Sequence, residues 1–125
     1  MCNPTNGMTV RGIGIDLCDI SRMQKLLDEG HSLRRMFTEE EQAYIITKKA
    51  TAAQTMAGMF AAKEAVLKAF GTGMSIAMTD IVITHTALGL PVARLQGKAA
   101  ELGGQVMISI THEAGMAAGM AVWTA

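Results

Sequence analysis

The segment from Ala52 to Gly73 constrains the fold most, because it has the pattern of one long helix with a lysine on its apolar face. With residues placed about 100° apart around a helix axis, its large apolar side chains form a single stripe. The stripe consists of Met56, Met59, Phe60, Val66, Leu67 and Phe70, and Lys63 lies within it. Because a buried charge without a partner is very costly, we expect this helix to border a polar cleft that holds an anion.

Two further charged residues share a flank of the same helix. Glu64 and Lys68 are four residues apart, on the side that carries the small residues Ala57 and Ala61. A single helical glutamate is most often a solvated carboxylate. A lysine beside apolar surface often rests its stem there and keeps its charged end in water. Both of these structural interpretations remain alternatives to a role in a site.

The composition predicts one domain whose core is built mainly from aliphatic side chains. Of the 125 residues, 50% are hydrophobic but only 4% aromatic, so aliphatic residues and the 11 methionines must fill the interior. The formal net charge is zero, which gives no support for a nucleic-acid or membrane binder. Cys2 and Cys18 fit two reduced thiols, and with no secretory segment in the sequence we expect a cytoplasmic protein.

The order of patterns predicts an α+β fold in which helices pack on an antiparallel sheet. Residues 1–7 are expected to form a flexible tail, followed by a single domain of residues 8–125. Period-two patterns predict strands at 10–17, 80–85, 91–95, 106–110 and 116–122. Periodicity and end signals predict helices at 22–30, 38–48, 52–70 and 98–102.

Three helix ends carry specific signals. Ser21 with Gln24, and Thr38 with Glu41, have the pattern of a capping box, in which two side chains satisfy backbone N–H groups at the start of a helix. Gly71 suits a left-handed cap at the end of the long helix.

Asp16 ends the first predicted strand, after two glycines at positions 12 and 14. Glycines in a strand let another backbone or a ligand come close, although an aspartate in this position is most often a turn or cap residue. Asp16 and Glu64 together would suit Mg²⁺, which takes few protein ligands and completes its shell with water and phosphate oxygens. This site requires the first strand and the long helix to lie side by side.

Two other segments have groups that could hold a ligand. Gly71-Thr72-Gly73 offers backbone N–H groups to a phosphate, although glycine after a helix is also ordinary capping. His112 follows the strand that ends at Ile110, where a turn is expected. A single histidine in a turn is more often structural than catalytic.

Basic residues gather around the first predicted helix and its exit. They are Arg22, Lys25, Arg34 and Arg35. Interleaved with apolar side chains, they suit docking against an acidic helix of a partner protein. The alternative is an ordinary amphipathic helix, whose charge is diluted by Asp28 and Glu29.

Three blocks of the sequence resemble the holo-acyl-carrier-protein synthase family of 4′-phosphopantetheinyl transferases. They are Gly12-Ile13-Gly14-Ile15-Asp16 with Ile20 and Arg22, the segment Phe60 to Gly73, and Ser109-Ile110-Thr111-His112. The blocks follow the family order and span nearly the whole chain. The second block, Phe-Ala-Ala-Lys-Glu-Ala-x-x-Lys-Ala-Phe-Gly-Thr-Gly, is highly specific, and Met36-Phe37-Thr38 with Glu41 also fits.

The resemblance implies the fold of these transferases and their reaction. The phosphopantetheine arm of coenzyme A is transferred to a serine of an apo acyl carrier protein, for fatty acid biosynthesis, and adenosine 3′,5′-bisphosphate is released. The expected catalytic residues are Asp16, Glu64 and Lys68: the two carboxylates would hold Mg²⁺, and Lys68 would neutralise or protonate the departing phosphate. The residues expected to contact the coenzyme or to shape its pocket are Lys63, Gly71, Thr72, Gly73 and His112. Arg22, Lys25, Arg34 and Arg35 would dock the carrier, and a homotrimer with active sites between protomers is expected.

Two positions depart from the family pattern and support an alternative function. Met59 and Leu90 stand where many members carry a basic residue, so positive charge that could help hold the nucleotide phosphates is lost. The alternative is a non-catalytic module of the same fold that binds coenzyme A or a carrier protein, which the intact Asp16 and Glu64 disfavour. A purely structural trimer would require all three blocks to match by chance.

Overall fold

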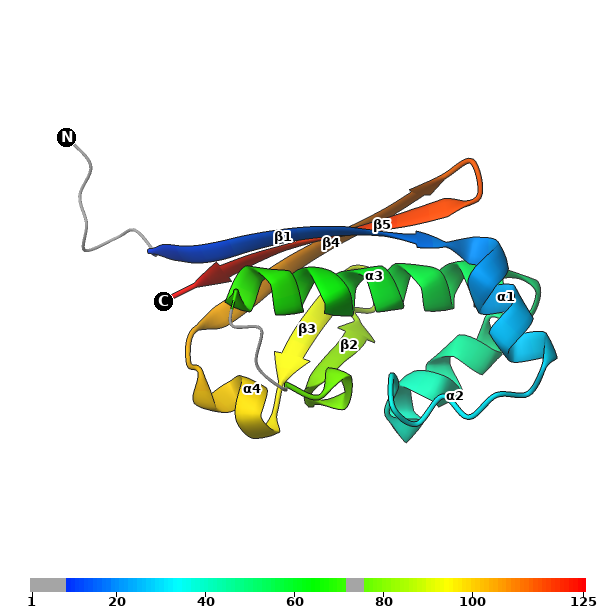
Figure 1. The fold of residues 1–125 in the computed structure, drawn as a ribbon, viewed down its shortest axis with the longest axis horizontal. Helices are drawn as coiled ribbons and strands as arrows, with labels where there is room; N and C mark the ends of the chain where they lie inside the picture. Colours follow the sequence, from blue (N-terminus) through cyan, green and yellow to red (C-terminus); the bar gives the residue numbers. More distant parts are fainter. Residues whose placement is uncertain (1–8, 72–75) are drawn as a thin grey trace.

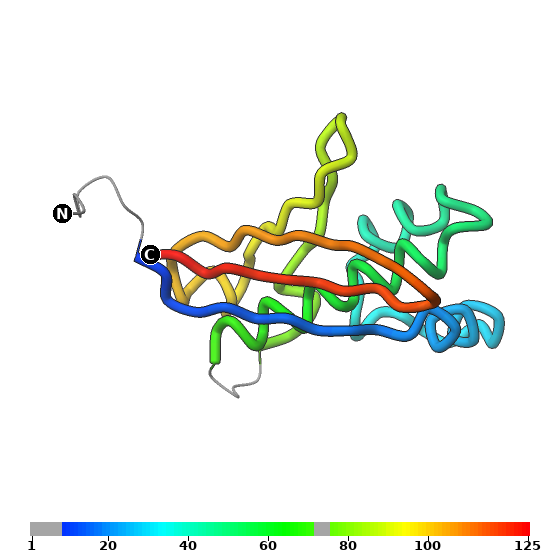
Figure 2. Tube along the Cα trace, turned by 90° about the horizontal axis from the view of Figure 1, so that it is seen from above, coloured from blue at the N-terminus to red at the C-terminus, as the bar shows by residue number. Residues whose placement is uncertain are grey.

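A three-stranded antiparallel sheet lies over one long helix in the computed structural model, which describes residues 9–71 and 76–125 (Figure 1). The strands are β1 (Val10–Asp19), β5 (Met116–Thr124) and β4 (Gln105–Glu113), in the spatial order β1-β5-β4. The helix is α3 (Ala52–Phe70). β1 and β4 therefore form the two opposite edges of the sheet (Figure 2).

A second layer covers the other side of α3. It contains the hairpin of β2 (Ile81–His85) and β3 (Pro91–Leu95), with α2 (Glu39–Thr47) and α4 (Gly97–Glu101) (Figure 1). Helix α1 (Ile20–Asp28) follows β1, and the 3-10 turns η1 (Lys49–Thr51) and η2 (Met78–Asp80) precede α3 and β2. The predicted α+β architecture, with helices packed on an antiparallel sheet, is confirmed.

Helix α3 approaches the sheet so closely that glycines are required opposite it. A Cβ atom added at Gly12 or Gly14 would clash with the backbone carbonyl of Ala69 or Ala65. On β5, a Cβ at Gly119 would meet the backbone of α3 in the same way. The close approach predicted for the glycines of β1 is therefore that of the α3 backbone itself, which brings helix and strand side by side.

The start of α1 differs from the prediction. The side chain of Asp19 accepts a hydrogen bond from the backbone N–H of Ser21 (2.9 Å) and is the cap, so the helix begins at Ile20. Gln24 does not take part in a capping box but donates to Asp28 (2.8 Å). The expected box at Ser21 was wrong because an aspartate two residues earlier accepts the same N–H.

The other two predicted helix ends are confirmed. Thr38 Oγ1 accepts from the N–H of Glu41 (3.2 Å), and Glu41 Oε1 accepts from the N–H of Thr38 (2.9 Å). Gly71 closes α3 in a left-handed conformation with φ of 64°. Its own N–H donates to the carbonyls of Leu67 and Lys68 (3.3 and 3.1 Å), so this amide serves the cap.

Strand β4 continues to Glu113, beyond its predicted end at Ile110, because it meets β5 in a tight turn at Ala114 and Gly115. Both turn residues have positive φ, 50° and 80°, as a two-residue hairpin turn of type I′ requires. His112 therefore lies within β4, paired with Ala117 of β5, and not in a turn.

Candidate active site

Lys68 and Asp16 form an ion pair where α3 passes the end of β1. Lys68 Nζ donates to Asp16 Oδ1 and to the backbone carbonyl of Ile15, both at 3.0 Å. Side chains of a strand alternate between its faces, so Asp16 shares the helix-facing side with Gly14 and Cys18. Its side chain is 19% exposed and that of Lys68 is 55% exposed, so the pair lies at the surface.

Glu64 precedes Lys68 by one helical turn and lies on the same flank of α3. Cys18 is a buried thiol on β1, and its pKa is affected by the charged side chains near it. Burial is the main cause that raises the pKa of Cys18; Arg22 opposes this rise, whereas Asp16, Asp19 and Glu64 reinforce it. The charges of Asp16, Glu64 and Arg22, which come from β1, α3 and α1, therefore all act on this one thiol.

Asp16 and Glu64 are suitable ligands for Mg²⁺. Across residues 9–71 and 76–125, His, Cys, Asp and Glu form no group of three or more that could hold a metal ion. A cation here would rest on two carboxylates and complete its shell with water and substrate oxygens, as Mg²⁺ commonly does with phosphate substrates. Hard carboxylate oxygens are the donors that this ion prefers.

The structure places Lys63 differently from the prediction. Its side chain is fully buried, and Nζ lies 2.6 Å from Glu41 Oε1 and donates also to the carbonyls of Ile81 (2.7 Å) and Met78 (3.0 Å). Burial lowers the pKa of Lys63, and the contact with Glu41 opposes that shift. Because an ammonium has three N–H donors and all three are used within the chain, Lys63 has no N–H left in this structure to donate to a coenzyme. The anion beside the apolar stripe is Glu41 of the same chain.

His112 lies at the opposite edge of the sheet from Asp16. On β5, Ala117 pairs with His112 on one side and with Cys18 of β1 on the other, so two strand spacings, about 10 Å, separate the edges. His112 Nε2 lies 3.1 Å from the side-chain amide nitrogen of Gln54. Within one chain, His112 on β4 and Asp16 on β1 belong to different edges of the sheet.

A pocket of about 330 Å³ adjoins His112. Tyr44 and His85 stack in it with ring centroids 4.1 Å apart, and Lys48 Nζ lies 4.8 Å from the Tyr44 ring. The buried Met59 lines the same pocket. The sequence does not group Tyr44, Lys48 and His85, because these residues share no periodic pattern and meet only in the folded chain.

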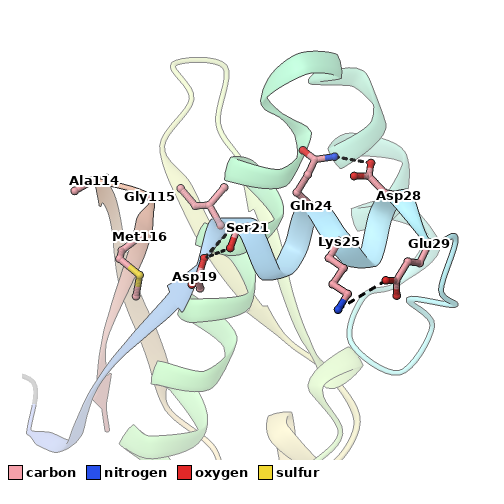
Figure 3. A pocket seen from close by; sticks show the side chains of 10 residues that line it. Asp19, Ser21, Gln24, Lys25, Asp28, Glu29, Ala114, Gly115 and Met116 are labelled. Atoms are coloured by element: carbon pink, nitrogen blue, oxygen red, sulfur yellow. Dashed lines mark hydrogen bonds and ion pairs between the residues drawn. The ribbon is translucent and has the colours of Figure 1, made fainter.

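A broader pocket, of about 810 Å³, lies between α1 and the β4–β5 turn (Figure 3). Its polar groups pair with one another: Gln24 donates to Asp28, and Lys25 Nζ lies 4.0 Å from Glu29. Carboxylates outnumber the basic Lys25 among the lining residues.

The expected docking residues are all exposed. Arg22 stands over the ring of Phe60 at 5.4 Å, beside the Asp16–Glu64 region, and Lys25 lines the α1 pocket. Arg34 and Arg35 lie in the segment that follows α1. The basic side chains are thus spread along one end of the molecule.

Apolar side chains cover the sheet face that is turned away from α3. Those on β1 are Ile13, Ile15 and Leu17; Met120 of β5 and Met107 of β4 join them, each between 47% and 69% exposed. The register places Ile15 beside Met120. Hollows next to these side chains include Lys68 and Asp16, so the predicted catalytic group borders this apolar face.

Thr72 and Gly73 lie outside the described residues. In the described part of the chain, no helix has the length and hydropathy needed to cross a membrane.

Comparison with known proteins identifies the family. A family model described as the 4′-phosphopantetheinyl transferase superfamily matches residues 12–115. The chain belongs to this superfamily. Over 119 residues it is 37% identical to the holo-[acyl-carrier-protein] synthase of Treponema denticola, covering 90% of this chain and 97% of that protein. Over 117 residues it is 40% identical to the enzyme of the same name from Trichlorobacter lovleyi, covering 86% and 92%.

Solved structures of this transferase superfamily show the same fold. The crystal structure of a holo-(acyl-carrier-protein) synthase from Bacillus anthracis, in complex with CoA (3′,5′-ADP), superposes with a TM-score of 0.78 at 31% identity. The match covers 94% of this chain and 98% of that one. The transferase fold expected from the sequence blocks is therefore confirmed.

Proposed function

We propose that the protein is a holo-[acyl-carrier-protein] synthase, which transfers the 4′-phosphopantetheine group of coenzyme A to a serine of apo acyl carrier protein. The observation that carries the proposal is the ion pair of Lys68 with Asp16, with Glu64 one turn before Lys68 on the same flank of α3, in a member of this superfamily. The reaction class fits, since phosphoryl transfer needs alignment and neutralisation of charge more than covalent help from the protein.

In the proposed reaction the serine oxygen bonds to the phosphorus that carries the pantetheine arm. The bond from this phosphorus to the bridging pyrophosphate oxygen breaks, and that oxygen leaves on adenosine 3′,5′-bisphosphate. The serine proton is lost to water at the site, because a carboxylate that holds a cation is a poor base. Lys68 stabilises the charge that develops on the leaving oxygen and can donate a proton to it.

We propose Asp16 and Glu64 as the residues that hold Mg²⁺. When bound, the ion would withdraw charge from the pyrophosphate and orient it. Asp16 is fixed by its strand and Glu64 by its helix, so both oxygen donors stand on rigid elements at the surface. Lys68 already balances one carboxylate charge at this point.

We further propose a homotrimer in which each active site lies between two protomers. Asp16 lies on the strand at one edge of the sheet and His112 on the strand at the other. One chain would therefore contribute Asp16 to one active site and His112 to another. The exposed apolar face of the sheet gives copies of the chain a surface to bury. The His112 pocket, with Lys48 and the Tyr44–His85 stack, would then receive the nucleotide part of coenzyme A beside the neighbour's Lys68.

The acyl carrier protein would dock on the basic residues Arg22, Lys25, Arg34 and Arg35. The reaction would take place in the cytoplasm, where coenzyme A is found. Arg22 connects this surface to the site, since it lies beside Asp16 and Glu64. Arg22→Glu is expected to raise KM for the carrier while coenzyme A binding is kept. Equal damage to both would mean that the carrier docks elsewhere.

The proposed function is tested by intact mass spectrometry of an apo acyl carrier protein after incubation with this protein, coenzyme A and Mg²⁺. The expected result is a mass gain of one phosphopantetheine arm, which EDTA prevents. Binding of coenzyme A without any mass gain would favour the non-catalytic binding module.

A further inference from the structure

The ion pair of Lys63 and Glu41 joins three parts of the fold that are distant in sequence. Both side chains are fully buried, and Nζ lies 2.6 Å from Glu41 Oε1. Glu41 belongs to the first turn of α2, and Lys63 to the middle of α3. The carbonyls of Met78 and Ile81, which also accept from Lys63, belong to η2 and the start of β2.

Hydrogen bonds satisfy both members of this buried pair. Glu41 Oε1 accepts from the N–H of Thr38 (2.9 Å), and Oε2 accepts from the N–H of Ile83 (2.8 Å). A fully satisfied buried ion pair adds little net stability compared with well-packed apolar residues, but it can specify one arrangement of the elements that it joins.

The opposite side of α3 packs on the sheet mainly through small residues, and an edge contact of Phe70 with Trp123 (ring centroids 5.1 Å apart) lies near the end of the helix. There the helix presents small buried residues, such as Ala61 and Ala65, to the backbone at Gly14 and Gly119. Helices normally lock through side-chain ridges that fit into grooves. Backbone packed against small residues allows a close approach and provides few such ridges, so contacts on the other side of α3 contribute to its rotation and axial position.

The position of α3 matters because the helix carries two of the three proposed catalytic residues. Glu64 directly follows Lys63, and Lys68 lies about one turn beyond it, whereas Asp16 stands on β1. Any rotation or shift of α3 relative to β1 therefore changes the geometry of Glu64 and Lys68 relative to Asp16.

We infer that Lys63 and Glu41 are positioning residues, whose buried contact sets the rotation and axial position of α3 and so places Glu64 and Lys68 against Asp16. Neither residue touches a reacting atom. The catalytic part of this inference rests on the proposed function, whereas the structural part, the position of α3 on β1, does not.

The test is the double substitution Lys63→Met with Glu41→Gln. It removes both charges together and so avoids leaving one buried ion unpaired, and glutamine keeps an oxygen for the N–H of Ile83. The matched control is Ile45→Ala or Ile45→Val, whichever has the closer melting temperature. Ile45 is a buried residue of α2, and its truncation loosens the core while the ion pair is kept.

With each protein fully folded, the double variant is expected to lose kcat by roughly 10- to 100-fold, because misplacement by about 1 Å has this effect. The control should keep kcat near the wild-type value. In two-dimensional NMR spectra the amide signals of Gly12, Gly14 and Gly119 are expected to shift in the double variant but not in the control. Should the double variant fail to fold, Glu41→Asp, which keeps both charges but shortens the arm that carries the carboxylate, is compared in the same way.

Unchanged glycine signals, or a kcat equal to that of the control, would overturn the inference and leave the pair with a role in stability only. The two hypotheses fail in different ways. A wild-type protein that transfers no phosphopantetheine would refute the proposed function, while the glycine signals would still decide whether the pair positions α3.

Discussion

At the residue scale, the contact between Lys68 and Asp16 has its importance in chemistry and not in stability. An exposed ion pair contributes about 0–1 kcal/mol to folding, and the Lys68 side chain is 55% exposed. Its ammonium nevertheless stands beside the carboxylate that we expect to face the pyrophosphate. Removal of Lys68 should therefore distinguish a role in the reaction from a role in stability.

Lys68→Ala is expected to slow phosphopantetheine transfer by roughly 10²- to 10³-fold, because a positioned charge on a developing anion contributes this much. The melting temperature should stay close to that of the wild type. Initial rates from mass spectrometry and a thermal melt measure the two effects. Lys98→Ala, on the exposed side of α4, is the control. A loss of only two- or threefold would make Lys68 a surface lysine whose stem merely packs on the helix.

Protonation of the single residue His85 is expected to lower the stability of the folded protein. Burial is the main cause that lowers the pKa of His85 below its ordinary value of 6.5, and the charge of Lys48 lowers it further. The unfolded chain therefore binds a proton at a higher pH than the folded chain does. It follows that stability is fully present above pH 6.5 and is lost as the pH falls toward the folded-state pKa.

We expect the melting temperature of the wild type to fall between pH 7.5 and 5.5 more than that of His85→Phe, which keeps a ring beside Tyr44 but cannot take up a proton. Thermal melts in matched buffers measure the difference. Parallel pH profiles of the two proteins would show that His85 does not titrate in this range.

At the element scale, local signals predicted what depends on local structure. The long periodic stripe identified α3, and a glycine at its end identified the cap. Thr38 and Glu41 were recognised as a capping box, since the pattern spans only three residues. The second contact of Glu41, with Lys63, spans 22 residues, and no periodic pattern in the sequence predicts it. A buried partner from another helix was thus mistaken for an external anion.

The same distinction explains the errors at strand ends. The extension of β4 to Glu113 depends on a two-residue turn at Ala114 and Gly115, where an alanine takes a positive φ of 50° that its residue type does not favour. The meeting of Asp16 and Glu64 was predicted only through family resemblance, because residues on a strand and a helix 48 positions apart come together by tertiary packing.

Gly14 tests the contact between β1 and α3. In Gly14→Ala the added Cβ would clash with the carbonyl of Ala65, so the strand and helix must separate. Overpacking of this kind costs about 1–3 kcal/mol, and we expect a lower urea midpoint together with weaker transfer, since Asp16 moves away from Glu64. Ala118→Gly, which removes a methyl group from β5, is a control for change in the sheet. A midpoint equal to that of the wild type would show that the helix does not lie as close as described.

At the scale of the whole molecule, the arrangement of two half-sites at opposite edges of one sheet predicts complementation between inactive proteins. Glu64→Gln removes a group at the β1 edge, and His112→Ala removes one at the β4 edge, so each variant alone should be inactive or nearly so. If an active site combines the β1 edge of one protomer with the β4 edge of the next, mixed oligomers contain some sites in which both groups are intact.

In randomly mixed oligomers, a given site has both intact halves with a probability of one half times one half. Co-refolded equimolar variants should therefore regain about a quarter of the wild-type rate, whereas simple mixing before subunit exchange should not. Sedimentation velocity establishes that the mixture has the size of the wild-type oligomer. No regain of activity in oligomers of that size would place the whole site within one protomer, and His112 would then be excluded from it by its distance from Asp16.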